Sequence, residues 1–200
     1  DIWHRGAHGG DEHDRGEHGM KRLPSRVAVV IGLAMALSLA LYWVLTPRPG
    51  PVSRAIGKVV DERLGQPVKI SDLTQFSWDE MLTIGPYVTD NGRAQWCEHW
   101  AVTTAQCEEI EFAPVSEGWV TLVFRHSGAV IHSEPHARIN GDFYPASFTL
   151  PLMPSDAVFD VMLVDGNVTE SGQLWRYLVR HGEAGPRGSK LATLAAGGAR

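Results

Sequence analysis

One apolar run, from Val27 to Leu45, constrains this chain more than any other feature, because no residue within it is charged. A helix of this length rises by about 1.5 Å per residue and so approaches the roughly 30 Å hydrocarbon thickness of a bilayer. Tyr42 and Trp43 are residue types that favour the membrane interface, and Pro47 follows where such a helix would stop. The sequence therefore predicts a transmembrane helix over residues 27–45.

Basic residues on the two sides of the run predict its orientation. Lys21, Arg22 and Arg26 precede the run, which favours an N-terminus in the cytoplasm. Arg48 and Arg54 follow it and weaken the asymmetry. We therefore expect a single-pass protein of the bacterial inner membrane, with its C-terminal domain in the periplasm.

A cleaved signal peptide is the alternative interpretation of the same run. Residues 20–26 would form its basic region, residues 27–37 its apolar core, and residues 38–40 (Ser-Leu-Ala) its cleavage site. Either interpretation exports the rest of the chain. Cleavage would leave the apolar residues 41–45 exposed at a new N-terminus, and this favours the uncleaved anchor.

Composition divides the rest of the 200-residue chain into tails, a linker and one domain. The polar, Gly-rich residues 1–26 predict a disordered cytoplasmic tail, and residues 1–19 resemble a non-native extension because Met20 and the basic residues after it form a typical start for an exported chain. Residues 46–51 predict a Pro/Gly linker. Residues 52–181 predict one periplasmic domain, and residues 182–200, rich in Gly and Ala, a disordered tail.

Apolar spacing predicts the main elements of the domain. Val52, Ile56 and Val60 recur at helical spacing, so residues 52–64 predict an amphipathic helix that ends at Gly65 and packs on the domain or, alternatively, on the bilayer. Alternating or continuous apolar residues predict strands over 108–112, 118–124 and 158–164, with turns at 127–128 and 165–166, and a last strand or short helix over 173–180. The predicted fold class is α+β: a transmembrane helix, then a small domain with a mostly antiparallel sheet and one or two helices.

Short motifs in residues 52–143 resemble an uncharacterised family of small bacterial exported lipoproteins and membrane-anchored proteins. These motifs are F-x-W-D, G-P-Y, an apolar strand and G-D-F, carried by Phe76, Trp78, Asp79, Gly85, Pro86, Tyr87, Leu122, Val123, Phe124, Gly141, Asp142 and Phe143. The chain departs from the lipoprotein members because no Cys at the end of the apolar run could carry a lipid. The resemblance implies an envelope location and a fold rather than a chemistry.

Four residues of these motifs are the candidate binding residues: Trp78, Asp79, Tyr87 and Asp142. Together they offer aromatic and acidic surface to a partner. The alternative is that Trp78 and Tyr87 are core aromatics beside a turn at Gly85.

The two cysteines, Cys97 and Cys107, both fall in the predicted exported domain. In an oxidising compartment they are expected to form a disulfide that closes a short loop. Two alternatives stay open. One is a zinc site formed by the cysteines with His99 and one further histidine (His126, His132 or His136), although the spacing matches no standard zinc motif. The other is two free thiols.

The sequence contains no motif for phosphate, dinucleotide, zinc-protease or serine-hydrolase chemistry. His132, Glu134, His136 and Arg138 occupy every second position and would share one face of a strand if Pro135 does not break it. We expect a solvated face there, with an anion or metal site as the alternative.

These observations favour a non-enzymatic binding or envelope-assembly module with no cofactor. The net charge of −5 and the lack of a basic stripe argue against nucleic acid as a partner and leave the inner membrane and an envelope protein. The alternative is a periplasmic hydrolase or metal-dependent enzyme that uses His132, His136 and a carboxylate such as Asp79 or Asp142.

Overall fold

The computed structural model describes residues 25–62, 65–168 and 174–191. The chain divides into two compact units, residues 1–46 and residues 47–200. Residues 1–24 of the predicted N-terminal tail lie outside the described residues. Residues 192–200 of the predicted C-terminal tail also lie outside them.

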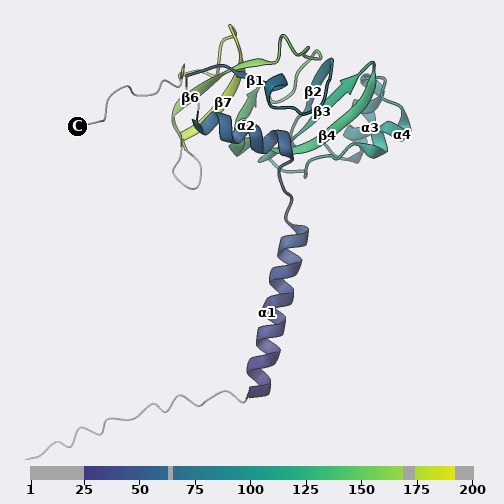
Figure 1. The fold of residues 1–200 in the computed structure, drawn as a ribbon, viewed down its shortest axis with the longest axis vertical. Coiled ribbons are helices and arrows are strands. Elements are labelled where there is room, and N and C mark those ends of the chain that lie inside the picture. Colours follow the sequence, from purple (N-terminus) through teal and green to yellow (C-terminus); the bar gives the residue numbers. More distant parts are fainter. Residues whose placement is uncertain (1–24, 63–64, 169–173, 192–200) are drawn as a thin grey trace, which may run out of the picture. The chain divides into compact units, whose positions relative to one another are not determined.

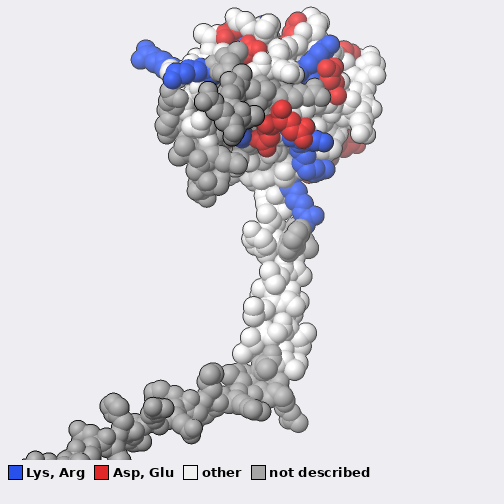
Figure 2. All heavy atoms as spheres, turned by 60° about the vertical axis from the view of Figure 1, so that its left-hand side comes forward, with Lys and Arg blue, Asp and Glu red and all other residues white. Residues whose placement is uncertain are grey.

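The first unit contains one helix, α1 (Ser25–Leu45). The large apolar side chains between Val29 and Tyr42 are exposed, and Figure 2 shows this stretch without a charged side chain. Among the described residues, no helix has both the length and the apolar character that crossing a membrane requires. The membrane span predicted over residues 27–45 therefore stays a prediction.

The second unit begins with helix α2 (Pro51–Glu62), which confirms the predicted amphipathic helix. Proline suits the first position of a helix because its missing N–H would have no partner there. Val52, Ile56 and Val60 are buried in the core of the domain, which supports packing on the domain rather than on a bilayer. Gly65 follows with a φ of 82°, a conformation that favours glycine.

Two sheets form the centre of the domain (Figure 1). The smaller sheet has the order β2-β3-β4 and is antiparallel throughout. The larger has the order β1-β6-β7-β5, with β8 also paired to β6, and only its β5–β7 pair is parallel. The strands are β1 (Val68–Lys69), β2 (Glu80–Ile84), β3 (Trp119–His126), β4 (Ala129–Ala137), β5 (Asp142–Tyr144), β6 (Val158–Val168), β7 (Leu174–Arg180) and β8 (Ser189–Leu191).

Both faces of the β2-β3-β4 sheet are covered. One face contributes Met81, Leu122 and Phe124 to a large core shared with α2 and the β1-β6-β7-β5 sheet. The other face contributes Leu82, Ile84 and Val123 to a smaller core beneath helices α3 (Asp90–His99) and α4 (Thr104–Glu109). Two short 3-10 helices, η1 (Ile70–Asp72) and η2 (Arg138–Asn140), complete the described elements.

The α+β class, the mostly antiparallel pairing and the hairpin at residues 127–128 are confirmed. Ser127 and Gly128 have φ values of 51° and 80°, so both adopt the left-handed conformation that a tight two-residue hairpin turn requires. The segment over 173–180 is strand β7 rather than a helix.

Several finer predictions are wrong. Residues 108–112 do not form a strand, because α4 continues to Glu109 and an irregular segment follows. Residues 165–166 are not a turn, because β6 runs through them to Val168. Strand β8 lies within the tail predicted over residues 182–200 and extends the domain to Leu191. The described part of the domain also has three α-helices instead of one or two.

A buried carboxylate fastens α2 to strand β4. The Oε1 atom of Glu134 accepts a hydrogen bond from the backbone N–H of Ser53 (2.6 Å), and its Oε2 atom accepts one from that of Val52 (3.1 Å). Both N–H groups belong to the first turn of α2, where no helical partner exists. Gly50 leaves the space for this contact, because a Cβ atom there would lie 2.3 Å from the Glu134 Cδ atom.

We predict that Glu134→Ala lowers the free energy of unfolding of the domain by about 2 to 3 kcal/mol, because two buried N–H donors lose their acceptor. Urea denaturation followed by tryptophan fluorescence measures this loss. Glu108→Ala, which removes an exposed carboxylate, serves as the matched control with a change under about 0.5 kcal/mol. Equal losses in the two variants would contradict the role of Glu134.

Candidate functional site

Two of the four candidate binding residues lie beside the β3–β4 hairpin. Trp78 is only 6% exposed; it packs against Phe124 and donates from Nε1 to the Thr74 hydroxyl (3.0 Å). Asp79 accepts a hydrogen bond from the backbone N–H of Ser127 (2.7 Å) and so braces the hairpin. Trp78 is therefore a core aromatic, and neither side chain opens onto a described hollow.

The other two candidates belong to a different cluster. Asp142 is buried, receives two hydrogen bonds from the Arg138 guanidinium (2.7 Å each) and a third from Trp175 Nε1 (2.9 Å). Arg138 also donates to the backbone carbonyl of Glu117, whose carboxylate lies 3.4 Å from the Tyr87 hydroxyl. The hydrogen bond to Asp142 raises the pKa of Arg138. The cluster is thus satisfied internally, although Tyr87 itself is 55% exposed and is not a core aromatic.

His132, Glu134 and His136 of the predicted row do share one face of β4, whereas Arg138 follows the strand and begins η2. That face is not solvated as expected, although His132 at its outer end is partly exposed. Glu134 and His136 are 1% and 0% exposed, because this face packs beneath α2. Pro135 is tolerated because β4 is an edge strand, and its carbonyl accepts a hydrogen bond from the backbone N–H of Gly50 (2.9 Å). His132 places Nε2 2.8 Å from Glu134 Oε2, and its ring packs at a tilt against Phe76 with centroids 4.7 Å apart.

His136 is held as a neutral imidazole. Burial lowers its pKa from 6.5 to about 4, and this effect outweighs the opposing influence of the Gly141 carbonyl and of the Glu134 and Asp142 carboxylates. Its Nε2 atom lies 2.7 Å from that carbonyl, whereas Nδ1 has no hydrogen-bond partner among the described residues. A histidine without solvent access cannot meet a substrate, so its role here is structural.

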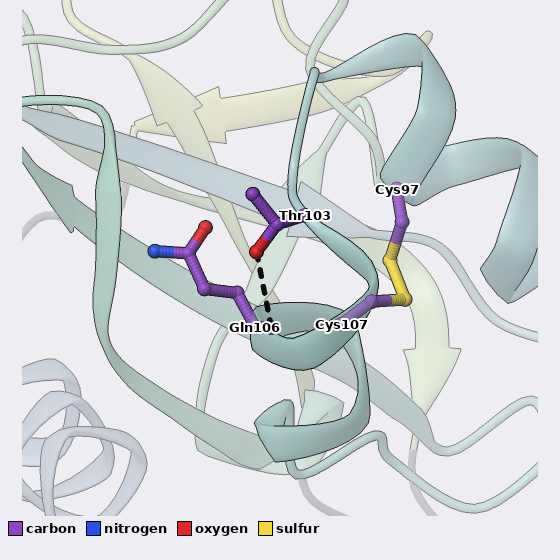
Figure 3. Close-up of a disulfide and its surroundings, with 4 residues drawn as sticks. All are labelled: Cys97, Thr103, Gln106 and Cys107. Carbon is purple, nitrogen blue, oxygen red and sulfur yellow. Dashed lines mark hydrogen bonds between the residues drawn. A yellow bond between two sulfur atoms is a disulfide. The ribbon is translucent and has the colours of Figure 1, made fainter.

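The Sγ atoms of Cys97 and Cys107 lie 2.00 Å apart, at disulfide distance (Figure 3). This confirms the expected pairing and leaves neither thiolate for the alternative zinc site. The bond joins α3 to α4, and Cys97 is buried in the smaller core with Leu82 and Ile84. The two short helices are therefore fixed to each other and to the sheet.

Helices α3 and α4 were missed at the sequence level, although one signal was present. Thr103 accepts a hydrogen bond at its hydroxyl from the backbone N–H of Gln106 (3.3 Å; Figure 3), and this T-x-x-Q spacing is typical of a helix start. In residues 90–109 apolar side chains are sparse and show no strong helical period, so periodicity alone could not reveal the helices.

A groove of about 520 Å³ lies beside α3. Its lining comes from the end of β2 and the residues after it, from α3 and the residue that follows that helix, and from residues 147–149. The residues that line this α3 groove are Thr83, Ile84, Gly85, Pro86, Val88, Gly92, Trp96, His99, Trp100, Ser147, Phe148 and Thr149. No residue predicted as a binding residue is among them.

Two tryptophans contribute to the lining beside α3. Trp96 on α3 and Trp100, the residue directly after the helix, are half-buried, with ring centroids 6.3 Å apart. Both pack against the smaller core that contains the disulfide, so their positions depend on the α3–α4 cover. The parts of the two tryptophans that this core does not cover line the α3 groove. With Phe148 and Pro86 they give the groove an apolar and aromatic lining.

The described residues contain no group of three or more His, Cys, Asp or Glu side chains that could hold a metal ion. No protein-family model, curated protein sequence or solved structure gives a significant match to this chain. The resemblance to the lipoprotein family thus stays a prediction, and the geometry alone bears on function.

We predict that the domain loses stability as the pH falls from about 6.5 to about 4. In this range the unfolded state binds a proton at His136 and the folded state does not, so the loss approaches about 3 kcal/mol in total. Urea midpoints across this range measure the effect. His136→Gln keeps a donor for the Gly141 carbonyl but cannot titrate, so its free energy of unfolding should change less steeply with pH, by up to one proton. Identical pH dependences in the wild type and the variant would refute the role of His136.

Proposed function

We propose that this chain is a membrane-anchored, non-enzymatic binding module of the bacterial envelope, and that its ligand site is the α3 groove. The observation that carries the proposal is the lining of the groove, where two half-buried tryptophans face a hollow of about 520 Å³. Concave, mostly apolar sites with a few polar groups are typical of ligand binding. The polar groups of the lining side chains are three hydroxyls, the His99 imidazole and the indole N–H groups of Trp96 and Trp100.

The geometry favours this function over a hydrolase or metal-dependent enzyme. Such an enzyme would use His132 and His136 with a carboxylate, yet His136 is fully buried and Glu134 is engaged at the start of α2. Asp142, the other carboxylate near His136, is held by Arg138 and Trp175. His136, Glu134 and Asp142 therefore stabilise the fold. His132 does line a hollow of about 230 Å³ at the start of α2, but its Nε2 atom lies 2.8 Å from the carboxylate of Glu134, which is already engaged by the helix.

The membrane anchor is proposed from residues 27–45, oriented with its N-terminus in the cytoplasm. The uncharged run in the sequence and the exposed apolar side chains of α1 support it, since apolar surface of this extent needs a lipid or protein cover. A disulfide fits the oxidising periplasm. On the domain, Figure 2 shows acidic and basic side chains interspersed on the face in view, with no basic stripe for nucleic acid.

A simple aromatic probe tests the binding site. We expect indole to shift the fluorine resonances of Trp96 and Trp100 in the 5-fluorotryptophan-labelled full chain in lipid nanodiscs, because their rings line the α3 groove. Trp175, which is held by Asp142, provides the internal control and should not shift. Trp→Phe variants assign the signals. Shifts at Trp175 without shifts at Trp96 and Trp100 would overturn the proposed site.

Membrane extraction tests the anchor. We predict that sodium carbonate leaves the wild-type chain in the membrane pellet and that Leu37→Arg increases the soluble fraction, since an arginine near the centre of a span costs about 3 kcal/mol. Val115→Arg, at an exposed position of the domain, is the matched control and should remain in the pellet. Complete extraction of the wild type would refute the anchor.

A further inference from the structure

We propose that a basic patch at the start of the domain, formed by Arg48, Arg54 and Lys58, docks on the anionic phosphate headgroups of the bilayer that holds the chain. All three residues are exposed. The inference rests on the membrane anchor of the proposed function and adds a second, electrostatic contact with the same membrane. It also gives a role to the basic residues that follow residues 27–45, which the anchor alone does not explain.

Two residues of the basic patch lie on the solvent side of α2. Arg54 and Lys58 are four residues apart and therefore project from the same side of the helix. The opposite side carries Val52, Ile56 and Val60, which are buried in the core of the domain. Because the core occupies this apolar side, α2 cannot offer it to a bilayer. Its exposed side can contact a bilayer only through charge.

The order of charges along α2 is the reverse of the order that stabilises a helix. A helix favours acidic side chains near its N-terminus and basic side chains near its C-terminus. The first turn of α2 contains no acidic residue and its last turn contains no basic residue. Instead Arg54 lies near the start, and Asp61 and Glu62 lie at the end. The positive charges in the first half of α2 therefore do not serve the helix itself, which indicates a partner outside it.

Carboxylates of the domain do not neutralise these two side chains of α2. Five other arginines of the domain form ion pairs: Arg93, Arg125, Arg138, Arg176 and Arg180. Within the part of the chain that the structure describes, neither Arg54 nor Lys58 forms one. The Arg54 guanidinium instead donates a hydrogen bond to the backbone carbonyl of Pro49, which holds its charge beside the linker. A negatively charged surface is the complementary partner for such a patch.

The length of the linker favours the lipid surface as this partner. Only residues 46–50 separate α1 from α2, and five fully extended residues reach at most roughly 18 Å. Basic residues beside a membrane span are attracted to anionic lipid, and the attraction falls off within a Debye length of about 8 Å. The anchor therefore keeps the basic patch close to the headgroups at all times, whereas a soluble partner would have to be recruited.

Acetylation of lysines by a water-soluble reagent, read by mass spectrometry, tests the inference on the full chain in lipid nanodiscs. We expect Lys58 to react at least about threefold more slowly when the nanodiscs contain phosphatidylglycerol than when they contain phosphatidylcholine alone, because docked headgroups cover it. Lys69, which is exposed on β1, is the internal control and should react equally in both lipids. About 0.5 M NaCl should remove the difference, since salt screens the attraction.

A pair of variants separates the basic patch from a general effect of the lipid. The double variant Arg48→Gln and Arg54→Gln should lose most of the protection of Lys58 in phosphatidylglycerol, because two of the three positive charges are gone. Arg187→Gln removes an exposed arginine elsewhere on the domain and should leave the protection unchanged. Equal protection of Lys58 in the two variants would contradict the role of the patch.

The outcomes separate this inference from the proposed function. If Lys58 reacts equally in the two lipids while the chain resists carbonate extraction, the inference falls and the anchor stands. If soluble inorganic phosphate protects Lys58 in phosphatidylcholine nanodiscs, the basic patch binds a free anion and the inference falls. If carbonate extracts the chain, the anchor and the inference fall together, and the binding of indole in the α3 groove is measured independently of both.

Discussion

The carboxylate of Glu134 determines how the domain closes. It lies in the interior and accepts hydrogen bonds from the first turn of α2, so the helix, strand β4 and the core beneath them are held as one body. A carboxyl group in such a position is tolerated only when its lone pairs are satisfied, and here two N–H donors and His132 surround it. Glu134 and His136 are therefore structural, whereas His132 at the outer end of the row lines a hollow of about 230 Å³.

The α3 groove exists because the β2-β3-β4 sheet is covered on both faces by different means. A long amphipathic helix and a second sheet cover one face, whereas two short helices joined by a disulfide cover the other. At one edge of this cover, α3 lines the α3 groove together with residues 83–88, at and after the end of β2, and with residues 147–149.

The elements that local sequence patterns determine could be predicted. The features that depend on contacts between residues far apart in the chain could not be predicted. The period of Val52, Ile56 and Val60 revealed α2, and Ser127-Gly128 revealed the hairpin. Nothing in the local sequence indicated that His136 would be buried. The polar residues at every second position of 132–138 are typical of a solvated strand face, and only the packing of α2 buries His136. Of the candidate residues, Trp78 proved to be a core residue and Asp142 part of a closed ion cluster. Trp96 and Trp100 were overlooked because their helix lacks a clear apolar period.

The disulfide makes the α3–α4 cover depend on the oxidation state of Cys97 and Cys107. Helices of ten and six residues are too short to persist on their own, and loss of such a crosslink typically costs about 2 to 5 kcal/mol. A newly made chain with reduced cysteines would hold Trp96 and Trp100 only loosely. Oxidation of the two cysteines therefore completes the α3–α4 cover, and the shape of the α3 groove depends on it.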